Sequence, residues 1–257
     1  MTLIQVLILS IIEGITEFLP ISSTGHLILA NHLLGIVDSN FTKSFEISIQ
    51  FGAILAVVAW YWRRIFTDIE TWKRIGTAFI PTAILGYIFY KLIKTYLLSN
   101  SVLVLWSLFL GGMALIIFEI WYKKKNRMVN DELQKISYKK SFVIGIAQSV
   151  AMIPGVSRSA ATIIGGLLLG LKRETIVEFS FLLAVPTMAA ATGFDFIKSA
   201  GSFSLNQFHL LAIGFVISFI IALVSIRWML YFIKNHTFVF FGIYRVIAAL
   251  LFWFFVA

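Results

Sequence analysis

The chain has 257 residues, of which 60% are hydrophobic and 13% charged, and its mean hydropathy is +0.93. This composition excludes a soluble domain and indicates an integral membrane protein, and the lack of cysteine excludes disulfides and thiolate metal sites. The net charge of +9 could suggest nucleic-acid binding, but in a membrane protein positive residues mark one side of the bilayer, so no nucleic-acid partner is expected.

Long apolar stretches follow one another along the chain, each close to the roughly 20 residues that a helix needs to cross the hydrocarbon core. They occupy residues 44–62, 75–90, 101–122, 175–194, 208–226 and 237–257. These runs are apolar on all sides and lack the period of two that a membrane β-barrel requires. The sequence therefore predicts an all-α integral membrane protein with six transmembrane helices.

Two further apolar regions contain a break that a simple span does not tolerate. Residues 3–37 are interrupted at Pro20 and the polar run "SSTGH", and residues 141–171 are interrupted by "PGVSRSAAT" from Pro154. Proline and glycine end a helix, and non-helical backbone persists at membrane depth only where protein or water satisfies it. We therefore expect two re-entrant helical hairpins in addition to the six spans.

The two interrupted regions also resemble each other. "IIEGITEFLPISSTGH" aligns with "IAQSVAMIPGVSRSAAT" with small gaps, and a glutamate follows each at a comparable distance, Glu46 and Glu178. The aligned pairs are Glu13 with Gln148, Pro20 with Pro154, and Ser22 with Ser157. A unit of one hairpin and three spans crosses the membrane an odd number of times, so its second copy is inverted. Residues 1–257 are therefore expected to form a single membrane domain, with repeat 1 at about 1–122, repeat 2 at about 138–257 and a basic loop at about 123–140.

The basic residues of the loops predict the orientation. If the first hairpin enters from the outside, the inner loops (63–74, 123–140, 172–174 and 227–236) carry 15 Lys and Arg, and the outer loops carry 4. The positive-inside rule then places both termini outside and the 123–140 loop in the cytoplasm. The two hairpins should approach the midplane from opposite faces.

Charged residues at membrane depth are costly and are candidates for function, with helix-packing partners as the alternative. Glu13 and Glu17 are four residues apart, so both carboxylates lie on one helix face near the break at Pro20. Two carboxylates this close need a cation, either Mg²⁺ or Ca²⁺ or the guanidinium of Arg158. The alternative is that one glutamate is protonated and only hydrogen-bonded.

Hydroxyl groups gather directly after each break. Ser23 and His26 are three residues apart on the following helix, where the imidazole can lie near the hydroxyl and activate it as a nucleophile. Capping or packing of the helix is the alternative for this pair. The other hydroxyls lie near helix N-termini, whose free N–H groups and positive dipole suit phosphate. They belong to Ser22, Thr24, Ser157, Ser159 and Thr162.

Arg158 lies within the second break. A guanidinium deep in an apolar protein needs an anionic partner, and its planar fork matches phosphate oxygens. If the two breaks meet, one pocket combines hydroxyls, helix N-termini, an arginine, a histidine and two carboxylates, as a phosphoryl-transfer site requires. Arg245 in the last span is expected to pair with Glu46 or Glu178 and hold the bundle together, with a contribution to the site as the alternative.

The motifs "EGITEFLPISSTGHL" and "PGVSRSAATI" closely resemble the two signature motifs of the bacterial undecaprenyl pyrophosphate phosphatase family, also known for bacitracin resistance, and the resemblance covers essentially the whole chain. It implies an integral inner-membrane enzyme that removes the terminal phosphate of undecaprenyl pyrophosphate, regenerating the lipid carrier for cell-wall synthesis, with its site open to the periplasm. The family's functional residues correspond here to Glu13, Glu17, Ser23, His26 and Arg158. Ala160 stands where the family often has glycine, a departure that removes no functional group.

On the basis of this resemblance, Ser23 is expected to attack the terminal phosphorus with His26 as base, while Arg158 and the helix N-termini stabilise the phosphoryl oxygens. Glu13 and Glu17 would hold the divalent cation or orient His26 and water. Direct attack by water activated by His26 is an open alternative. A polyprenyl-phosphate flippase using the same anion site is the competing function. The small-residue pattern "GLLLG", residues 166–170, leaves a homodimer open.

Overall fold

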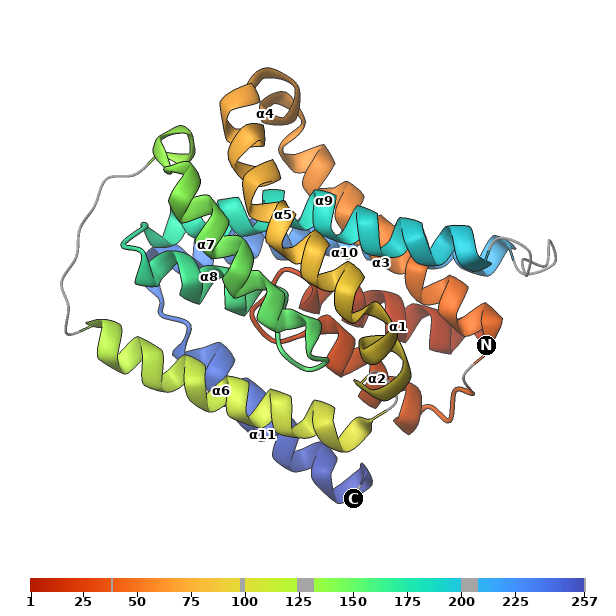
Figure 1. The fold of residues 1–257 in the computed structure, drawn as a ribbon. Helices are drawn as coiled ribbons and strands as arrows, with labels where there is room; N and C mark the ends of the chain where they lie inside the picture. The colour runs from red at the N-terminus through yellow and green to blue at the C-terminus, as the bar shows by residue number, and fades with distance from the viewer. Residues whose placement is uncertain (38, 98–99, 124–131, 200–207, 257) are drawn as a thin grey trace.

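The protein is entirely helical in the part that the structure describes, which comprises residues 1–37, 39–97, 100–123, 132–199 and 208–256 of a computed structural model (Figure 1). The helices are α1 (Leu3–Thr16), α2 (Ser23–Leu33), α3 (Asn40–Trp60), α4 (Trp62–Thr67), α5 (Ile69–Leu92), α6 (Ser101–Lys123), α7 (Tyr138–Ser149), α8 (Arg158–Leu168), α9 (Arg173–Ser199), α10 (Phe208–Asn235) and α11 (Val239–Val256). A π-helical turn (Ile93–Leu97) follows α5, and short 3₁₀ turns (Leu133–Lys135 and Val150–Met152) flank α7. Residues 124–131, most of the predicted basic loop, lie outside the described residues.

Five helices are long and apolar enough to cross a membrane, namely α3, α5, α6, α9 and α10. They coincide with five of the six predicted spans and indicate a multi-pass membrane protein. The sixth predicted span, residues 237–257, forms α11, which is apolar but shorter than these five. The helices also run beyond the predicted apolar stretches. α10, for example, continues to Asn235, because polar residues extend a spanning helix into the interface.

The two interrupted regions form helical hairpins, as the sequence predicts. α1 and α2 have 14 and 11 residues, and α7 and α8 have 12 and 11, so none of them is long enough to cross the hydrocarbon core alone. The first break spans residues 17–22 and contains Pro20, and the second spans residues 150–157 and contains Pro154. Both breaks end in a serine that caps the next helix: the Ser22 hydroxyl accepts from the Gly25 amide, and the Ser157 hydroxyl from the Ala160 amide.

Each hairpin packs against a helix of the other half of the chain. α1 contacts α10 and α7 contacts α5, while α6 and α11 lie side by side as a pair (Figure 1). The close approach requires glycine at both contacts. A Cβ on Gly14 would lie 2.7 Å from the Cβ of Ile221 on α10, and a Cβ on Gly145 would collide with the carbonyl of Ala78 on α5. Because each hairpin packs on a helix of the other half, the two halves are interlocked and the two hairpins come together.

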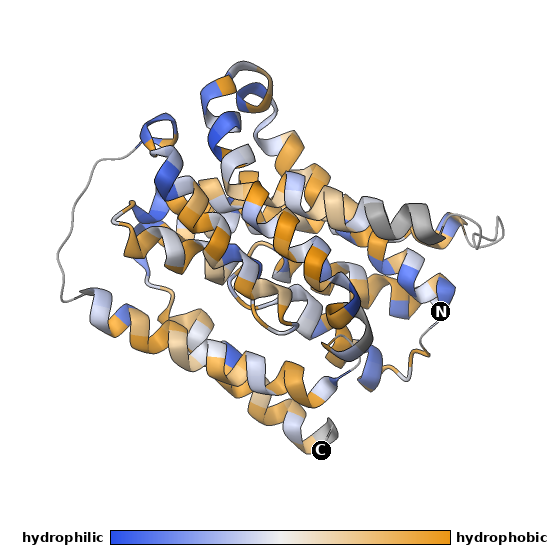
Figure 2. Ribbon diagram, viewed as in Figure 1, coloured by the Kyte–Doolittle hydropathy of each residue, from blue (hydrophilic) through white to orange (hydrophobic). Residues whose placement is uncertain are grey.

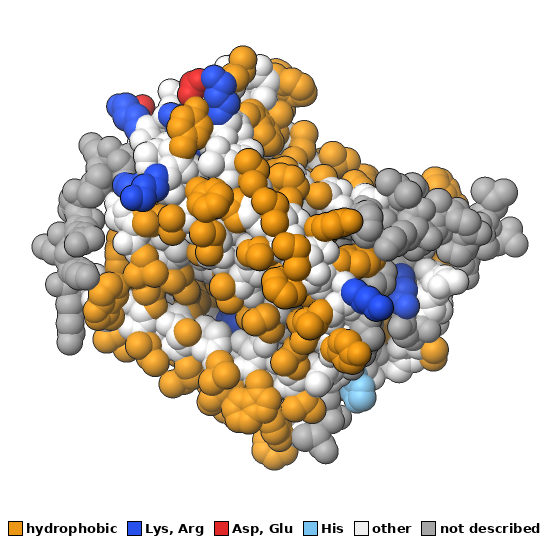
Figure 3. Space-filling view, in the orientation of Figure 1, with side chains coloured by type: hydrophobic (Ala, Val, Ile, Leu, Met, Phe, Trp, Pro, Cys, Tyr) orange, Lys and Arg blue, Asp and Glu red, His pale blue; other side chains and the backbone are white. Residues whose placement is uncertain are grey.

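Two basic segments predicted for the inner side meet at one end of the bundle. α4 and the start of α7 are hydrophilic at this end (Figure 2). The side chain of Arg74 donates from Nε to the carbonyl of Ile136 at 2.6 Å, and Gln134 donates to the carboxylate of Asp68 at 3.1 Å. The face drawn in Figure 3 is otherwise dominated by hydrophobic side chains, as a lipid-exposed surface requires.

Candidate active site

The two breaks are in direct contact, although they are more than a hundred residues apart in the sequence. The hydroxyl of Ser159 donates to the carbonyl of Phe18 at 3.1 Å, and that of Ser157 donates to the carbonyl of Leu19 at 3.5 Å. All four residues are buried. The second hairpin therefore satisfies carbonyl groups that the first break leaves without helical partners.

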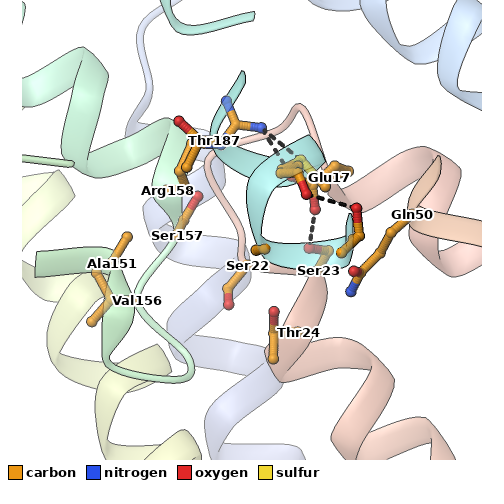
Figure 4. A pocket seen from close by; sticks show the side chains of 13 residues that line it. Glu17, Ser22, Ser23, Thr24, Gln50, Ala151, Val156, Ser157, Arg158 and Thr187 are labelled. Carbon is orange, nitrogen blue, oxygen red and sulfur yellow. Dashed lines mark hydrogen bonds and ion pairs between the residues drawn. The ribbon is translucent and has the colours of Figure 1, made fainter. Parts of the chain in front are cut away.

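A cavity of about 240 Å³ opens where the breaks meet (Figure 4). The first hairpin contributes a carboxylate and three hydroxyl side chains to it, and the second contributes the guanidinium. Two long helices, α3 and α9, close the remaining sides. The lining residues are Glu17, Ser22, Ser23, Thr24, Gln50, Ala151, Val156, Ser157, Arg158, Thr187, Met188, Ala191 and Thr192.

Glu17 connects the two hairpins at the centre of this cavity. One carboxylate oxygen accepts a hydrogen bond from the hydroxyl of Ser23, and the other accepts from Nη2 of Arg158 at 2.9 Å (Figure 4). Arg158 is held in place from the other side, because its Nη1 donates to the carbonyl of Ser180 on α9 at 2.8 Å. The side chains of Glu17 and Arg158 are 8% and 13% exposed, so the pair is largely shielded from water. A hydroxyl, a carboxylate that can accept its proton and a guanidinium that can bind phosphate oxygens thus lie together.

The backbone at Ser22 explains how Ser23 comes to face Glu17. Ser22 has φ 73° and ψ 95°, and it is the one non-glycine residue with positive φ among those described. This sharp turn ends the first break and places Ser23 at the first position of α2, next to the cavity. The first turn of α8 also borders the cavity through Ser157 and Arg158. Both helices therefore direct their N-terminal ends, which favour anions, toward one space.

His26 does not contact the Ser23 hydroxyl, which differs from the predicted nucleophile and base pair. Its Nδ1 lies 2.7 Å from the carbonyl of Ser22, and its Nε2 lies 2.9 Å from the hydroxyl of Tyr244. The imidazole also stacks on the Tyr244 ring at 5.5 Å between centroids, and His26 does not line the cavity. Residues three apart on a helix are near enough to interact. Here, however, the Ser23 hydroxyl donates to Glu17 and the imidazole contacts Tyr244 of α11.

Glu13 lies one helical turn before Glu17 and is completely buried. Neither of its carboxylate oxygens has a hydrogen-bond partner among the described residues. In the described residues, no three or more His, Asp or Glu side chains are grouped so that they could hold a metal ion. Carboxylate oxygens are the donors that Mg²⁺ and Ca²⁺ take, so the two side chains have the right chemistry for such a cation, although Glu13 does not line the cavity.

Two residues predicted to bind substrate do not line the cavity. Ser159 donates to Phe18, and the hydroxyl of Thr162 donates to the carbonyl of Arg158 at 2.8 Å, one turn back in α8. Their hydroxyls are buried in contacts with backbone, as is common for serine and threonine within helices. Ser22, Thr24 and Ser157 line the cavity, and their binding of substrate stays a prediction.

The remaining intramembrane charges have other partners than expected. Glu46 accepts from the amide of Asn31 at 2.8 Å, and Glu178 forms an ion pair with Arg64 on α4. Arg245 pairs with neither glutamate and donates to four backbone carbonyls instead. The predicted structural role of Arg245 agrees with these contacts, whereas the predicted ion pair was wrong.

Sequence reasoning missed the side of the cavity formed by the spans. Gln50 comes from α3, and Thr187 and Thr192 come from α9. The signal was present in the sequence, since a glutamine and two threonines interrupt otherwise apolar stretches. Polar residues within spans face the protein interior or a wet cavity more often than lipid.

Comparison with known proteins agrees with the motifs. The family model described as "Bacitracin resistance protein BacA" matches residues 6–251. An undecaprenyl-diphosphatase of Aquifex aeolicus is 54% identical over 252 residues, covering 98% of each chain. Proteins of the same name from Sulfurihydrogenibium sp. and Persephonella marina are 52% and 51% identical, covering 98% and 100% of this chain and 99% and 100% of their own lengths.

Proposed function

Because the chain belongs to the family of bacitracin resistance protein BacA, we propose that it is an undecaprenyl-diphosphatase, which hydrolyses undecaprenyl diphosphate to undecaprenyl phosphate and inorganic phosphate. The observation that carries this proposal is the contact of Glu17 with both Ser23 and Arg158 inside the shared cavity. The reaction would recycle the lipid carrier used in peptidoglycan synthesis.

The geometry supports Glu17 as the base for the Ser23 hydroxyl. Ser23 Oγ attacks the terminal phosphorus, its proton passes to Glu17, and the bond between that phosphorus and the bridging oxygen breaks to release undecaprenyl phosphate. Arg158 and the N-termini of α2 and α8 stabilise the charge on the phosphoryl oxygens. A water molecule then attacks the phosphoserine and releases phosphate. Direct attack by a water that Glu17 activates is the variant that requires no phosphoserine.

A divalent cation, Mg²⁺ or Ca²⁺, is proposed to bind between Glu13 and Glu17. The unpartnered oxygens of the buried Glu13 support this proposal. The cation would supply positive charge to the diphosphate. Chelation is expected to abolish phosphate release, and Glu13→Gln is expected to raise the Mg²⁺ concentration needed for half-maximal rate, which titration of the purified protein would measure.

We propose six spans and two re-entrant hairpins as the membrane arrangement, with the two halves as inverted repeats. The pairing of α1 with α10 and of α7 with α5 supports it, because each hairpin occupies the same place against the other half. The gathering of two basic segments at one end supports a cytoplasmic position for that end. A bacterial inner membrane with the site facing the periplasm, as the resemblance of the two motifs implies, is part of the same proposal.

The function is tested by phosphate release from a long-chain polyprenyl diphosphate in detergent. Ser23→Ala and Arg158→Ala are expected to lose nearly all activity while keeping the thermal unfolding temperature of a folded protein. Ser141→Ala and Arg64→Ala are the matched controls, since neither residue lines the cavity, and both should retain activity. Retained turnover in both Ser23→Ala and Arg158→Ala would contradict the enzyme.

A flippase is not favoured as the function. The relatives are named for a phosphatase activity, and translocation needs an anion site but not a hydroxyl bound to a carboxylate.

A further inference from the structure

Arg245 on α11 is the largest fully buried side chain among the residues that the structure describes, and only 1% of it is exposed. Four of its N–H groups donate to backbone carbonyls. Nε donates to Leu108 at 3.3 Å, and Nη2 donates to Ser107 at 3.0 Å and to Gly155 at 2.9 Å. Nη1 donates to Pro20 at 3.4 Å. One guanidinium therefore joins three separate segments of the chain.

Two of these carbonyls belong to the breaks that form the active site. Pro20 lies two residues before Ser22 in the first break, and Gly155 lies two residues before Ser157 in the second. Carbonyls at such breaks have lost their helical donors and need others when buried. Arg245 donates to one carbonyl in each break and to two carbonyls of α6, so it connects the two hairpins through contacts separate from the Glu17 and Arg158 pair.

Arginine suits this position better than any other cation. Its five N–H donors point outward in one plane, whereas lysine has three donors on a single nitrogen. Among the described residues the guanidinium has no carboxylate partner, and its hydrogen bonds all go to backbone carbonyls. Burying an arginine in this way costs free energy. A role for the four contacts in the geometry of the site explains why an arginine is buried here.

Neighbouring glycines leave the space that the guanidinium occupies. A Cβ on Gly111 of α6 would collide with the guanidinium of Arg245. A Cβ on Gly155, which has φ 89°, would lie 2.7 Å from the Cβ of Ser107 and 2.7 Å from the carbonyl oxygen of Val104. The second break thus lies directly on α6, and the absence of side chains at both glycines allows the four contacts of Arg245.

The preceding residue of α11 reaches the first hairpin as well. The hydroxyl of Tyr244 contacts Nε2 of His26, whose Nδ1 contacts the carbonyl of the strained Ser22. Two consecutive residues of α11 therefore hold the backbone on either side of Ile21, immediately before Ser23. Neither Tyr244 nor Arg245 lines the cavity.

We propose that Arg245 is a positioning residue that clamps the two hairpin breaks at the separation at which Ser23 and Arg158 share Glu17. This inference rests on the proposed function for its catalytic consequence, but the clamp itself is a property of the breaks. It assigns α11 and α6 a part in the geometry of a site to which they contribute no lining side chain.

The test compares Arg245→Lys and Gly111→Ala with Gly76→Ala, measuring hydrogen exchange of the backbone amides and phosphate release. Lysine can satisfy fewer carbonyls, and alanine at 111 displaces the guanidinium without changing its charge. Gly76 is the matched control, since a Cβ there meets nothing within 4 Å. In both test variants, exchange should become faster at residues 18–24 and at residues 153–159, and kcat should fall by about tenfold to a hundredfold with KM within about twofold, because a misplacement near 1 Å costs this much.

Three results would overturn the clamp. Unchanged exchange at both breaks would show that Arg245 only packs the bundle. An unchanged kcat with faster exchange would show that the clamp does not serve the site. A raised KM with unchanged kcat would indicate direct binding of substrate. If the unsubstituted protein released no phosphate, the proposed function would fail, whereas faster exchange in both breaks would still establish the clamp.

Discussion

Substitution of Glu17 by glutamine tests the central group of the site. Glu17 accepts from Ser23 with one oxygen and from Arg158 with the other, and its side chain is 8% exposed. Glutamine has nearly the same size and retains one carbonyl oxygen, so the cavity and its packing should be preserved. Its neutral amide cannot take the proton of Ser23, and it leaves Arg158 without an ionised partner.

The size of the effect follows from these two losses. A positioned general base contributes about 10² to 10⁴ in rate, which corresponds to about 3 to 5 kcal/mol of the barrier. A hydrogen bond between charged groups contributes about 1.5 to 3 kcal/mol, and its loss frees Arg158 to shift within the cavity. We expect kcat of Glu17→Gln to fall by at least about 10³.

The assay is steady-state phosphate release from a long-chain polyprenyl diphosphate in detergent, with kcat and KM determined separately. Glu178→Gln is the matched control, because Glu178 is an intramembrane glutamate that pairs with Arg64 outside the cavity, and it should keep kcat within about threefold. A kcat for Glu17→Gln above one tenth of the unsubstituted value would refute the role of base. A raised KM with unchanged kcat would make Glu17 a binding group only.

Three further outcomes are expected from contacts outside the Glu17 pair. His26→Gln should lower kcat by about tenfold, because losing the contact with the Ser22 carbonyl costs about 1.4 kcal/mol. If His26→Gln instead lost nearly all activity, as Ser23→Ala is expected to, His26 rather than Glu17 would be the base. Gly14→Ala should lower the stability by about 1 to 3 kcal/mol in thermal unfolding, since its Cβ has no room against α10; unchanged unfolding would contradict this packing. Arg173→Met should lower the stability by about 3 to 5 kcal/mol, because the buried Glu119, which Arg173 contacts at 2.5 and 2.7 Å, would keep only the Phe238 amide as a partner, while the folded fraction keeps its kcat; an unchanged stability would refute the pair.

The sequence predicted the helical class and the breaks correctly because both depend on local properties. Apolar stretches near 20 residues can bury their backbone polar groups only as helices. Pro20 and Pro154 each lie in a break, between the end of one helix and the serine that caps the next, whereas Pro81 and Pro186 lie inside α5 and α9. The boundaries were less accurate, as α10 shows by continuing nine residues beyond the predicted end at 226. Polar residues at the interface do not stop a helix, so hydropathy alone does not mark its end.

The site was predicted in part, and the division has a physical cause. Ser23, Glu17 and Arg158 were predicted as neighbours because hydroxyl and charged groups at membrane depth are rare and the two motifs place them in or next to the breaks. The role of His26 as a base was not supported by its contacts, because residues three apart on a helix are only near enough to interact. Which group takes the Ser23 hydroxyl depends on where Glu17 and Tyr244 lie, and these come from different segments.

What the sequence determined by itself is therefore a membrane-spanning helical chain with two interrupted hairpins and a set of groups suited to phosphate. Only the tertiary structure decided that the hairpins meet, that Gln50 and Thr187 close the cavity, and that Arg245 binds carbonyls rather than a glutamate. Hydropathy and helix breaks act over a few neighbouring residues. The partner of a side chain is set by the packing of segments a hundred or more residues apart, and that packing is not written in any one stretch of the chain.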